Sequence, residues 1–239
     1  MNLILFERGE IAVALPRGDR RAIHLLDVLR RQKGETFDAG LVNGPKGKGT
    51  VVAISESTIS LSFCWGEQPP PSDPVTMIVG LPRPQTGRAL LRDLTSMGVA
   101  AIHFVTTERG DPNYASSSLW SSGEWRRHLL TGAEQAFCTH LPKVTFDLSL
   151  AAALTASNAS GNARIALDIY ESTLPLYEFR SSAPYVTLAV GQERGWSAGE
   201  RDLLRDERYT LTNLGRRVLR TETACVSALT LIKAERRWL

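Results

Sequence analysis

The sequence predicts an α/β protein, with a small β-rich N-terminal part followed by a larger part built on a mostly parallel sheet. After residue 74, six short apolar runs rich in β-branched residues recur, with helical patterns between most of them. The segment "GEQPPPSDP" at 66–74 separates the two parts, because three consecutive prolines can continue neither a helix nor a central strand. We therefore expect two domains, at 1–68 and 75–239.

The chain has 239 residues, a hydrophobic content of 43% and a net charge of +3. This composition supports one large or two ordinary domains, and its mildly basic balance is weak evidence for a polyanionic partner. The apolar runs fall short of the roughly 18 residues that a membrane helix needs, and the N-terminus lacks a secretory signal. Cys64, Cys138 and Cys225 are scattered, which argues for a reducing compartment. We expect a cytoplasmic protein with no membrane partner.

The N-terminal part is expected to form strands around one helix. Extended segments are predicted at 10–16 and 36–42, and alternating apolar residues predict a hairpin over 50–63. The predicted helix has an apolar stripe with i, i+3, i+4, i+7 spacing, formed by Ala22, Leu25, Leu26 and Leu29. At roughly 70 residues, such a domain is near the lower limit for folding alone.

The C-terminal part alternates strands with helices, which favours βαβ units and a parallel sheet covered on both faces. The strands are expected at 75–81, 101–107, 142–146, 164–170, 185–191 and 209–215. Ligands of such sheets bind beyond the carboxyl ends of strands. The glycine-containing turns after the last two strands are therefore the expected location of a site.

The first of these turns is "AVGQERGWSAGERDLL" at 189–204. Gly191 and Gly195 bracket a tight turn after a buried strand, and Ser197 with Glu200 predicts a capping box at the start of a helix. The turn presents backbone N–H groups beside a strand end, as phosphate-binding loops do. Its spacing matches neither of the two common nucleotide-binding glycine motifs. The pattern alone fits a structural turn and a ligand-binding loop equally.

The second turn is "LGRRVLRTETACVSALTLI" at 214–232. Gly215 ends a strand, and Thr221 is the expected cap of a helix that begins near Glu222. Apolar residues then cover most of the helix surface. Such a helix must be covered on all sides, either by the rest of the domain or by a second subunit.

Together these turns resemble the paired signature of the RsmE-type RNA methyltransferases of the SPOUT superfamily, "GPEGG(W/F)S..E" and "LG.RILR.ETA". The second match is nearly complete and therefore specific. "HLLDVLR" at 24–30, "MGVAAIHFV" at 97–105 and "GAEQAFCTHLPKV" at 132–144 are similar to further segments of that family. The resemblance spans almost the whole chain.

The resemblance implies methylation of N3 of a uridine in 16S ribosomal RNA, with S-adenosylmethionine as cofactor, by a homodimer. It also implies a PUA-like RNA-binding barrel over 1–68. The domain over 75–239 would be a SPOUT α/β domain whose end is threaded into a deep trefoil knot, with the cofactor in the knot and the RNA near the subunit interface. No metal is expected, because Cys138 and His140 lack a second pair of ligands nearby.

The family motifs assign roles to individual residues. Arg220 and Glu222 match "R.ETA" and are the catalytic candidates: a carboxylate can take the proton from uracil N3, and an arginine can stabilise the resulting anion. The alternative is that Glu222 stabilises the helix dipole and pairs with an arginine. The expected cofactor-binding residues are Leu167, Val190, Gly191, Glu193, Gly195, Leu214, Gly215, Val218 and Leu219.

Basic residues of both parts are expected to contact RNA phosphates. They are Arg30, Arg31, Lys46, Lys48, Arg109, Arg194 and Arg216. The polar stretch "NYASSS" at 113–118 resembles an RNA-contacting loop of the family, and a plain exposed loop is the equal alternative.

The chain departs from the family near the expected RNA face. Gln192 and Arg194 replace a proline and a glycine of "GPEGG", and the arginine either narrows the pocket or adds a phosphate contact. Asp93 and Ser96 replace a lysine and a glutamate, and Cys138 replaces an arginine. These changes keep three alternatives open: another RNA site, ribose 2′-O methylation, or RNA binding without catalysis.

Overall fold

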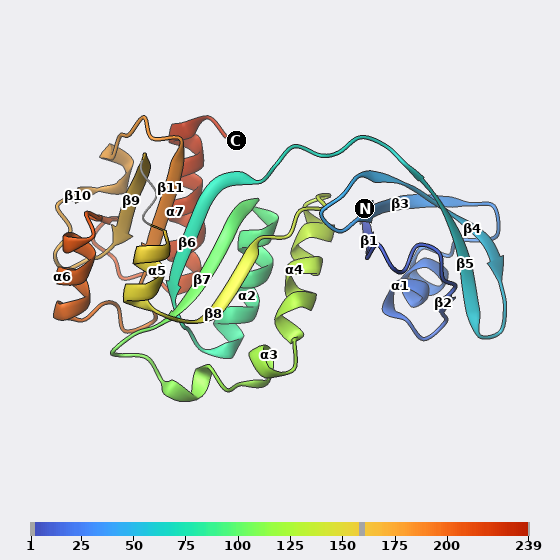
Figure 1. Cartoon of the computed structure of the whole chain (residues 1–239), viewed down its shortest axis with the longest axis horizontal. Coiled ribbons are helices and arrows are strands. Elements are labelled where there is room, and N and C mark those ends of the chain that lie inside the picture. The colour runs from blue at the N-terminus through green and yellow to red at the C-terminus, as the bar shows by residue number, and fades with distance from the viewer. Residues whose placement is uncertain (1–2, 158–160, 239) are drawn as a thin grey trace. The chain divides into compact units, whose positions relative to one another are not determined.

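The computed structural model describes residues 3–157 and 161–238 (Figure 1). The chain forms two compact units. One contains the residues up to Pro71 together with Leu130–Leu141, and the other contains Ser72–Leu129 and Pro142–Leu239. Within the described ranges, no helix has both the length and the apolar character needed to cross a membrane.

The first unit is a curled, mixed five-stranded sheet with the order β1-β3-β4-β5-β2 (Figure 1). Its strands are β1 (Ile4–Phe6), β2 (Leu15–Pro16), β3 (Thr36–Leu41), β4 (Lys46–Ile54) and β5 (Thr58–Trp65). Strands β4 and β5 form the predicted hairpin. The predicted helix is α1 (Arg20–Ile23), which continues as a π-helix over His24–Val28. Its residues Ala22 and Leu25 are fully buried in the core of this unit.

The strand expected at 10–16 is wrong over most of its length, since only β2 is extended. Residues 10–13 turn instead: the Val13 amide donates to the Glu10 carbonyl, and the Glu10 carboxylate accepts from the Glu7 amide and from Arg21. These local polar contacts compete with strand pairing. The parallel strand β1 was not predicted, because its three buried residues show no alternation.

The second unit contains a seven-stranded parallel sheet with the order β10-β12-β9-β11-β6-β7-β8. Its strands are β6 (Asp73–Gly80), β7 (Val99–Thr106), β8 (Lys143–Ser149), β9 (Asn162–Leu167), β10 (Leu174–Pro175), β11 (Tyr185–Val190) and β12 (Thr210–Asn213). All six predicted strands are confirmed. The short edge strand β10 was not predicted.

Helices cover both faces of this sheet (Figure 1). The helices of this unit are α2 (Pro84–Ser96), α3 (Ser118–Ser121), α5 (Leu150–Ala156), α6 (Ala198–Asp206) and α7 (Thr221–Arg236), with short 3₁₀ turns at Pro112–Tyr114 and Leu176–Glu178. Helix α4 (Glu124–Gln135) begins in this unit and ends in the first. Residues of α5 and α6 form one buried cluster with Trp196 on one face of the sheet. Helix α7 packs against α2 and β11.

One expectation about α7 is wrong, and one of two alternatives for its surroundings is excluded. The helix begins at Thr221, one residue earlier than expected, so Arg220 is in the cap position and makes no side-chain cap bond. Thr221 is helical and buried, and so it cannot be the cap. The helix is also not covered on all sides within the single chain. Its buried face consists of Thr221, Cys225, Ala228, Leu229 and Ile232, whereas Leu231 is 38% exposed.

Candidate functional site

A cavity of about 730 Å³ lies at the carboxyl ends of β9, β11 and β12. Three loops line it: 167–170 after β9, 190–196 after β11, and the segment that runs from β12 into α7. Residues 83–89 at the start of α2 complete the wall. This is the edge at which parallel sheets bind their ligands, so the position of the cavity agrees with the expectation from the strand pattern.

The loop after β11 is tight because its two glycines lie close together. A Cβ atom on Gly191 would come within 3.0 Å of the Gly195 Cα. Gly195 has φ +65°, which favours glycine, and its amide donates to the Gln192 carbonyl at 2.8 Å. Glu193 turns its carboxylate to the start of α2, where Oε1 accepts from the Arg83 amide at 3.2 Å. The loop is therefore held in one conformation.

The helix that follows this loop starts with the predicted capping box. Ser197 Oγ accepts from the Glu200 amide at 3.1 Å, and Glu200 Oε2 accepts from the Ser197 amide at 2.8 Å. The preceding Trp196 is fully buried, and its Nε1 donates to the Leu167 carbonyl at 3.0 Å. This bond joins the loop after β11 to the end of β9. The expected capping box is confirmed.

The loop after β12 is shaped by Asn213 and Gly215. Asn213 Oδ1 accepts from the Gly215 amide at 2.9 Å, and its Nδ2 donates to Ser172 Oγ at 2.9 Å. Gly215 has φ +100°, a conformation that other residues rarely adopt. Farther along, the apolar side chain of Val218 is 76% exposed although it lines the cavity. An exposed apolar side chain at a cavity wall is suited to contact with a ligand.

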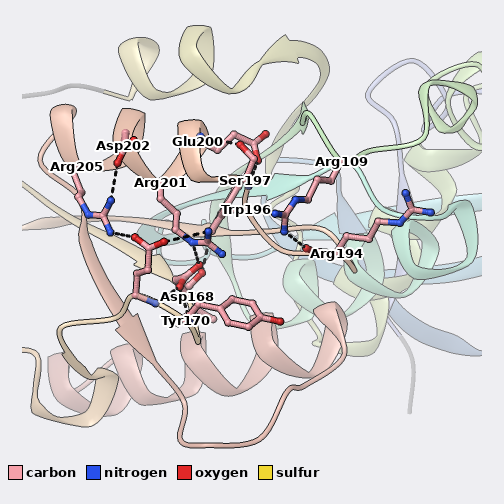
Figure 2. A network of polar contacts seen from close by, with 12 residues as sticks. Arg109, Asp168, Tyr170, Arg194, Trp196, Ser197, Glu200, Arg201, Asp202 and Arg205 are labelled. Carbon is pink, nitrogen blue, oxygen red and sulfur yellow. Dashed lines mark hydrogen bonds and ion pairs between the residues drawn. The ribbon is translucent and has the colours of Figure 1, made fainter.

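The loop after β9 is fixed by a buried ion pair that the sequence analysis missed (Figure 2). Asp168 Oδ2 lies 2.7 Å from Arg201 Nε, and both side chains are buried. Asp168 Oδ1 accepts from the amides of Tyr170 and Glu171, at 2.8 and 2.7 Å. The Arg201 guanidinium also lies 5.4 Å from the centre of the Tyr170 ring. The only available sequence signal was an acidic residue directly after an apolar strand.

A short polar chain extends from this pair along α6 (Figure 2). Glu171 contacts Arg201 Nη1 at 3.4 Å and also pairs with Arg205. Arg205 Nη1 donates to Asp202 at 2.8 Å. The loop after β9 is thereby attached to α6 by charged groups as well as by packing, which holds the cavity wall in place.

The cavity brings together residues that the sequence analysis selected from three separate motifs. Every residue expected to bind the cofactor lines it, as do Arg220, Glu222 and Arg194. Arg109 lies beside it, since its Nη1 donates to the Arg194 carbonyl at 3.1 Å. Arg216 is exposed and directly precedes the lining residue Arg217. The lining residues that were missed include Gln85, Thr86, Asp168, Tyr170 and Thr212.

The other expected RNA contacts belong to the first unit. Arg30 is exposed with φ 53°, and Arg31 is half-buried. Lys46 donates to the Phe137 carbonyl at 3.3 Å and lies over the Phe137 ring, and Lys48 pairs with Asp38 at 2.6 Å. Among the residues that the structure describes, no group of three or more His, Cys, Asp or Glu side chains is arranged to hold a metal ion.

The second unit is an α/β domain whose parallel sheet has a cavity at its carboxyl edge, which is the arrangement of ligand-binding α/β domains. Residues 68–233 match the family described as "RNA methyltransferase domain". The chain is 32% identical to the ribosomal RNA small subunit methyltransferase E of Treponema pallidum, over 98% of this chain and 91% of that protein. The protein of the same name from Synechocystis is 28% identical, over 88% of this chain and 70% of that protein. The chain therefore belongs to the ribosomal RNA small subunit methyltransferase E family, as the resemblance indicated.

Solved structures share the fold over almost the whole chain. The family member from Neisseria gonorrhoeae, solved with S-adenosyl methionine bound, has a TM-score of 0.81 at 21% identity, over 98% of this chain and 97% of that chain. A probable rRNA-methyltransferase from Porphyromonas gingivalis has a TM-score of 0.80 at 19% identity, over 98% and 99% of the two chains. These likenesses confirm the predicted α/β class.

Proposed function

We propose that this protein transfers a methyl group from S-adenosylmethionine to N3 of a uridine in 16S ribosomal RNA. One observation carries the proposal: residues of the two signature motifs, including Arg220 and Glu222, line a single cavity together with residues at the end of β9. The relatives are named for methylation of the ribosomal small subunit, and the Neisseria protein was solved with S-adenosyl methionine bound.

The residues of the cavity fit this cofactor. A volume of about 730 Å³ is within the usual range for sites that enclose a small molecule. Beside Gly195 and Gly215 an added Cβ atom would meet no other atom within 4 Å, so a ligand can approach the main chain closely there. The residues that would hold the cofactor are Leu167, Val190, Gly191, Glu193, Gly195, Leu214, Gly215, Val218 and Leu219. When bound, its sulfonium group supplies an electrophilic methyl group.

The protein's own task is to make uracil N3 nucleophilic. The N3–H group is a weak acid, so its proton must be accepted as the methyl group is transferred. Glu222 in the first turn of α7 is the proposed acceptor, and Arg220 before that helix is the proposed partner of the negative charge that develops on O2 or O4. Both residues line the cavity that would contain the cofactor.

The buried cysteine of α7 does not interfere with this chemistry. Cys225 is fully buried, and burial, together with the nearby charge of Glu222, raises the pKa of its thiol. A thiolate is the nucleophilic form of cysteine. Because Cys225 remains protonated at neutral pH, it does not compete with uracil for the methyl group.

RNA binding is proposed to involve both domains. Residues 1–68 would form a PUA-like RNA-binding domain, in which Arg30, Arg31, Lys46 and Lys48 contact phosphates. Residues 75–239 would form the methyltransferase domain, with Arg109, Arg194 and Arg216 next to its cavity. Such contacts add affinity in a salt-dependent way and carry no sequence information. A ribosomal substrate also places the enzyme in the cytoplasm.

We further infer a knot and a homodimer. Strand β12 pairs with β9 on the side away from β11, yet the segment after it returns to line the cavity beside 190–196, and α7 then packs on α2 and β11. This path supports a threaded chain end, which is a rare exception to the usual topology rules. Leu231 is partly exposed on α7 and lines a small hollow with Leu176 and Phe179, whose rim also includes Glu235 and Arg236, and a second subunit would cover it.

The test combines the purified protein, labelled S-adenosylmethionine and small ribosomal subunits that lack this methylation. Digestion of the RNA and separation of the nucleosides identify the product. Label in 3-methyluridine is the expected result. Label in a ribose-methylated nucleoside or another RNA would overturn the assignment of position or substrate. No transfer by a protein that binds the cofactor would indicate RNA binding without catalysis.

A further inference from the structure

The loop that follows β7 is joined to the loop 190–196 after β11 by hydrogen bonds in both directions. Gln192 is only 5% exposed, and its Nε2 donates to the Arg109 carbonyl at 3.1 Å. In return, Arg109 Nη1 donates to the Arg194 carbonyl at 3.1 Å (Figure 2). The neighbouring Glu108 amide donates to Glu200 Oε1 at 2.8 Å. The loop after β7 is thus linked to the loop after β11 by two hydrogen bonds and to α6 by a third.

The two loops meet over a glycine that leaves little free space. A Cβ atom on Gly80, the last residue of β6, would lie 2.6 Å from the Gln192 amide nitrogen and 3.1 Å from Thr107 Cγ2. Side chains essentially never tolerate such a distance to a backbone nitrogen. The main chain of Gln192 is therefore closely packed against the end of β6, and its side-chain amide donates to the Arg109 carbonyl.

Gln192 stands where the family signature has proline, which has no side-chain donor. Arg194 stands where that signature has glycine. The link from Gln192 to the Arg109 carbonyl and the charge of Arg194 therefore both depend on departures of this chain from the signature. The two departures flank Glu193, which the signature shares.

Arg109 and Arg194 place two cations on adjoining loops. Both residues are exposed, and in the part of the chain that the structure describes neither guanidinium pairs with a carboxylate. Arg109 uses one donor on the Arg194 main chain and keeps others available. Two cations on loops that contact each other, neither paired with a carboxylate of the described residues, favour binding of a polyanion. Arginine is well suited to a phosphate, to which it can donate two parallel hydrogen bonds.

We propose that Gln192 is a positioning residue that holds Arg109 beside Arg194, so that the two arginines together bind the RNA phosphate backbone next to the cofactor cavity. The proposal rests on the proposed function for the identity of the RNA. Gln192 belongs to the cavity wall, but its side-chain amide donates to the Arg109 carbonyl and is not one of the proposed catalytic groups. It acts through the main chain of Arg109.

The test is the variant Gln192→Met, which keeps the length of the side chain and removes its donor. Binding to small ribosomal subunits lacking the methylation is measured over a series of salt concentrations. The expected result is a several-fold weaker affinity and a salt dependence whose slope is reduced by about one. The substitution removes no charge, so a change in slope reports that an arginine has moved away from its phosphate.

Turnover provides a second readout. KM for the ribosomal subunit is expected to rise several-fold while kcat stays within about twofold, because the reacting groups are unchanged. Arg109→Ala should show the same two effects, and the double variant should resemble Arg109→Ala alone. Such non-additivity is expected only if Gln192 acts through Arg109.

The matched control is Arg180→Ala. Arg180 is likewise exposed and donates to main-chain carbonyls, those of Tyr177 and Phe179. Its removal should leave the slope unchanged. Equal cofactor affinity and equal thermal midpoints for Gln192→Met and the parent would exclude a general folding defect.

The proposal is overturned if Gln192→Met leaves both slope and KM unchanged, or weakens binding without changing the slope. A parent protein that binds the subunits and transfers no methyl group would instead contradict the proposed function. The salt dependence of the variants would still test the role of Gln192 in that case.

Discussion

At the scale of single residues, the shape of the cavity wall depends on the buried carboxylate of Asp168. Asp168 and Arg201 form a buried pair, and the same carboxylate accepts from two backbone amides of the loop after β9. Removing one member of a buried pair leaves the other charge without compensation, which costs more than the intact pair contributes. Asp168 is therefore needed for the shape of the site although it is given no part in the chemistry.

The variant Asp168→Asn should lower the free energy of unfolding by about 3 kcal/mol, because the longer contact with Glu171 would then be the remaining ion pair of the buried Arg201. Urea unfolding followed by circular dichroism measures the change. The double variant Asp168→Asn with Arg201→Met should recover part of the loss. A cost below about 1 kcal/mol for the single change would show that water or Glu171 compensates the arginine.

A second residue-scale prediction concerns Glu222. The variant Glu222→Gln keeps the size of the side chain and removes the proposed proton acceptor, so kcat should fall at least about 100-fold while the affinity for S-adenosylmethionine is unchanged. Single-turnover methylation assays and cofactor titration provide the two values. Glu178→Gln, on an exposed 3₁₀ turn, is the matched control.

Intact turnover in Glu222→Gln would remove the residue from the mechanism. Glu222 would then have the alternative role of a negative charge in the first turn of α7, where it interacts favourably with the helix dipole. In that case the variant should show only a small loss of stability.

At the scale of elements, α2 and α4 are joined by an ion pair. Glu124 in the first turn of α4 accepts from Arg88 Nε of α2 at 2.9 Å and lies 3.1 Å from His128 Nε2. Arg88, and secondly His128, lower the pKa of Glu124 from 4.5 to about 2. The carboxylate is thus favoured in the folded state relative to the unfolded chain.

This shift predicts the acid response of the protein. A carboxyl group whose pKa is lower in the folded state contributes stability above its unfolded pKa and loses it as pH falls through the folded pKa. The contribution of Glu124 should therefore be complete above about pH 4.5 and disappear towards pH 2. In Glu124→Gln the free energy of unfolding should vary less over this window. Identical pH profiles for parent and variant would contradict the assignment.

At the scale of the whole molecule, the surface of α7 bears on assembly. The helix buries one face in its own domain and leaves Leu231 partly exposed, beside a hollow lined by Leu176, Phe179 and Val186. The proposed homodimer would place this face at its interface.

The variant Leu231→Glu should convert the proposed dimer to a monomer, because burying a carboxylate at the interface is costly and Arg236, which lines the same hollow, is already paired with Glu235. Sedimentation velocity gives the mass of parent and variant. Thr155→Glu, an exposed change on α5, is the control and should leave the mass unchanged. A monomeric parent, or a dimeric Leu231→Glu, would contradict the assignment of this face.

The sequence by itself determined the strands of the second unit and its two signature turns. Buried parallel strands appear as continuous apolar runs, and glycines with a capping box mark a tight turn before a helix, so both are local properties of the chain. The prediction failed at 10–13, where local polar contacts prevailed, and at the start of α7, where Thr221 is a buried helical residue and not the cap. It also failed for strands as short as β1 and β10.

Only the tertiary structure decided which residues form the site. Asp168 and Arg201 are 33 positions apart, and Gln192 and Arg109 are 83 apart, so no pattern of spacing reveals either contact. The parallel sheet brings them together because its strands end at a common edge, and the loops there contact one another whatever their order in the chain. Buried ion pairs and side-chain to main-chain bonds require this three-dimensional arrangement, since their partners lie on different elements.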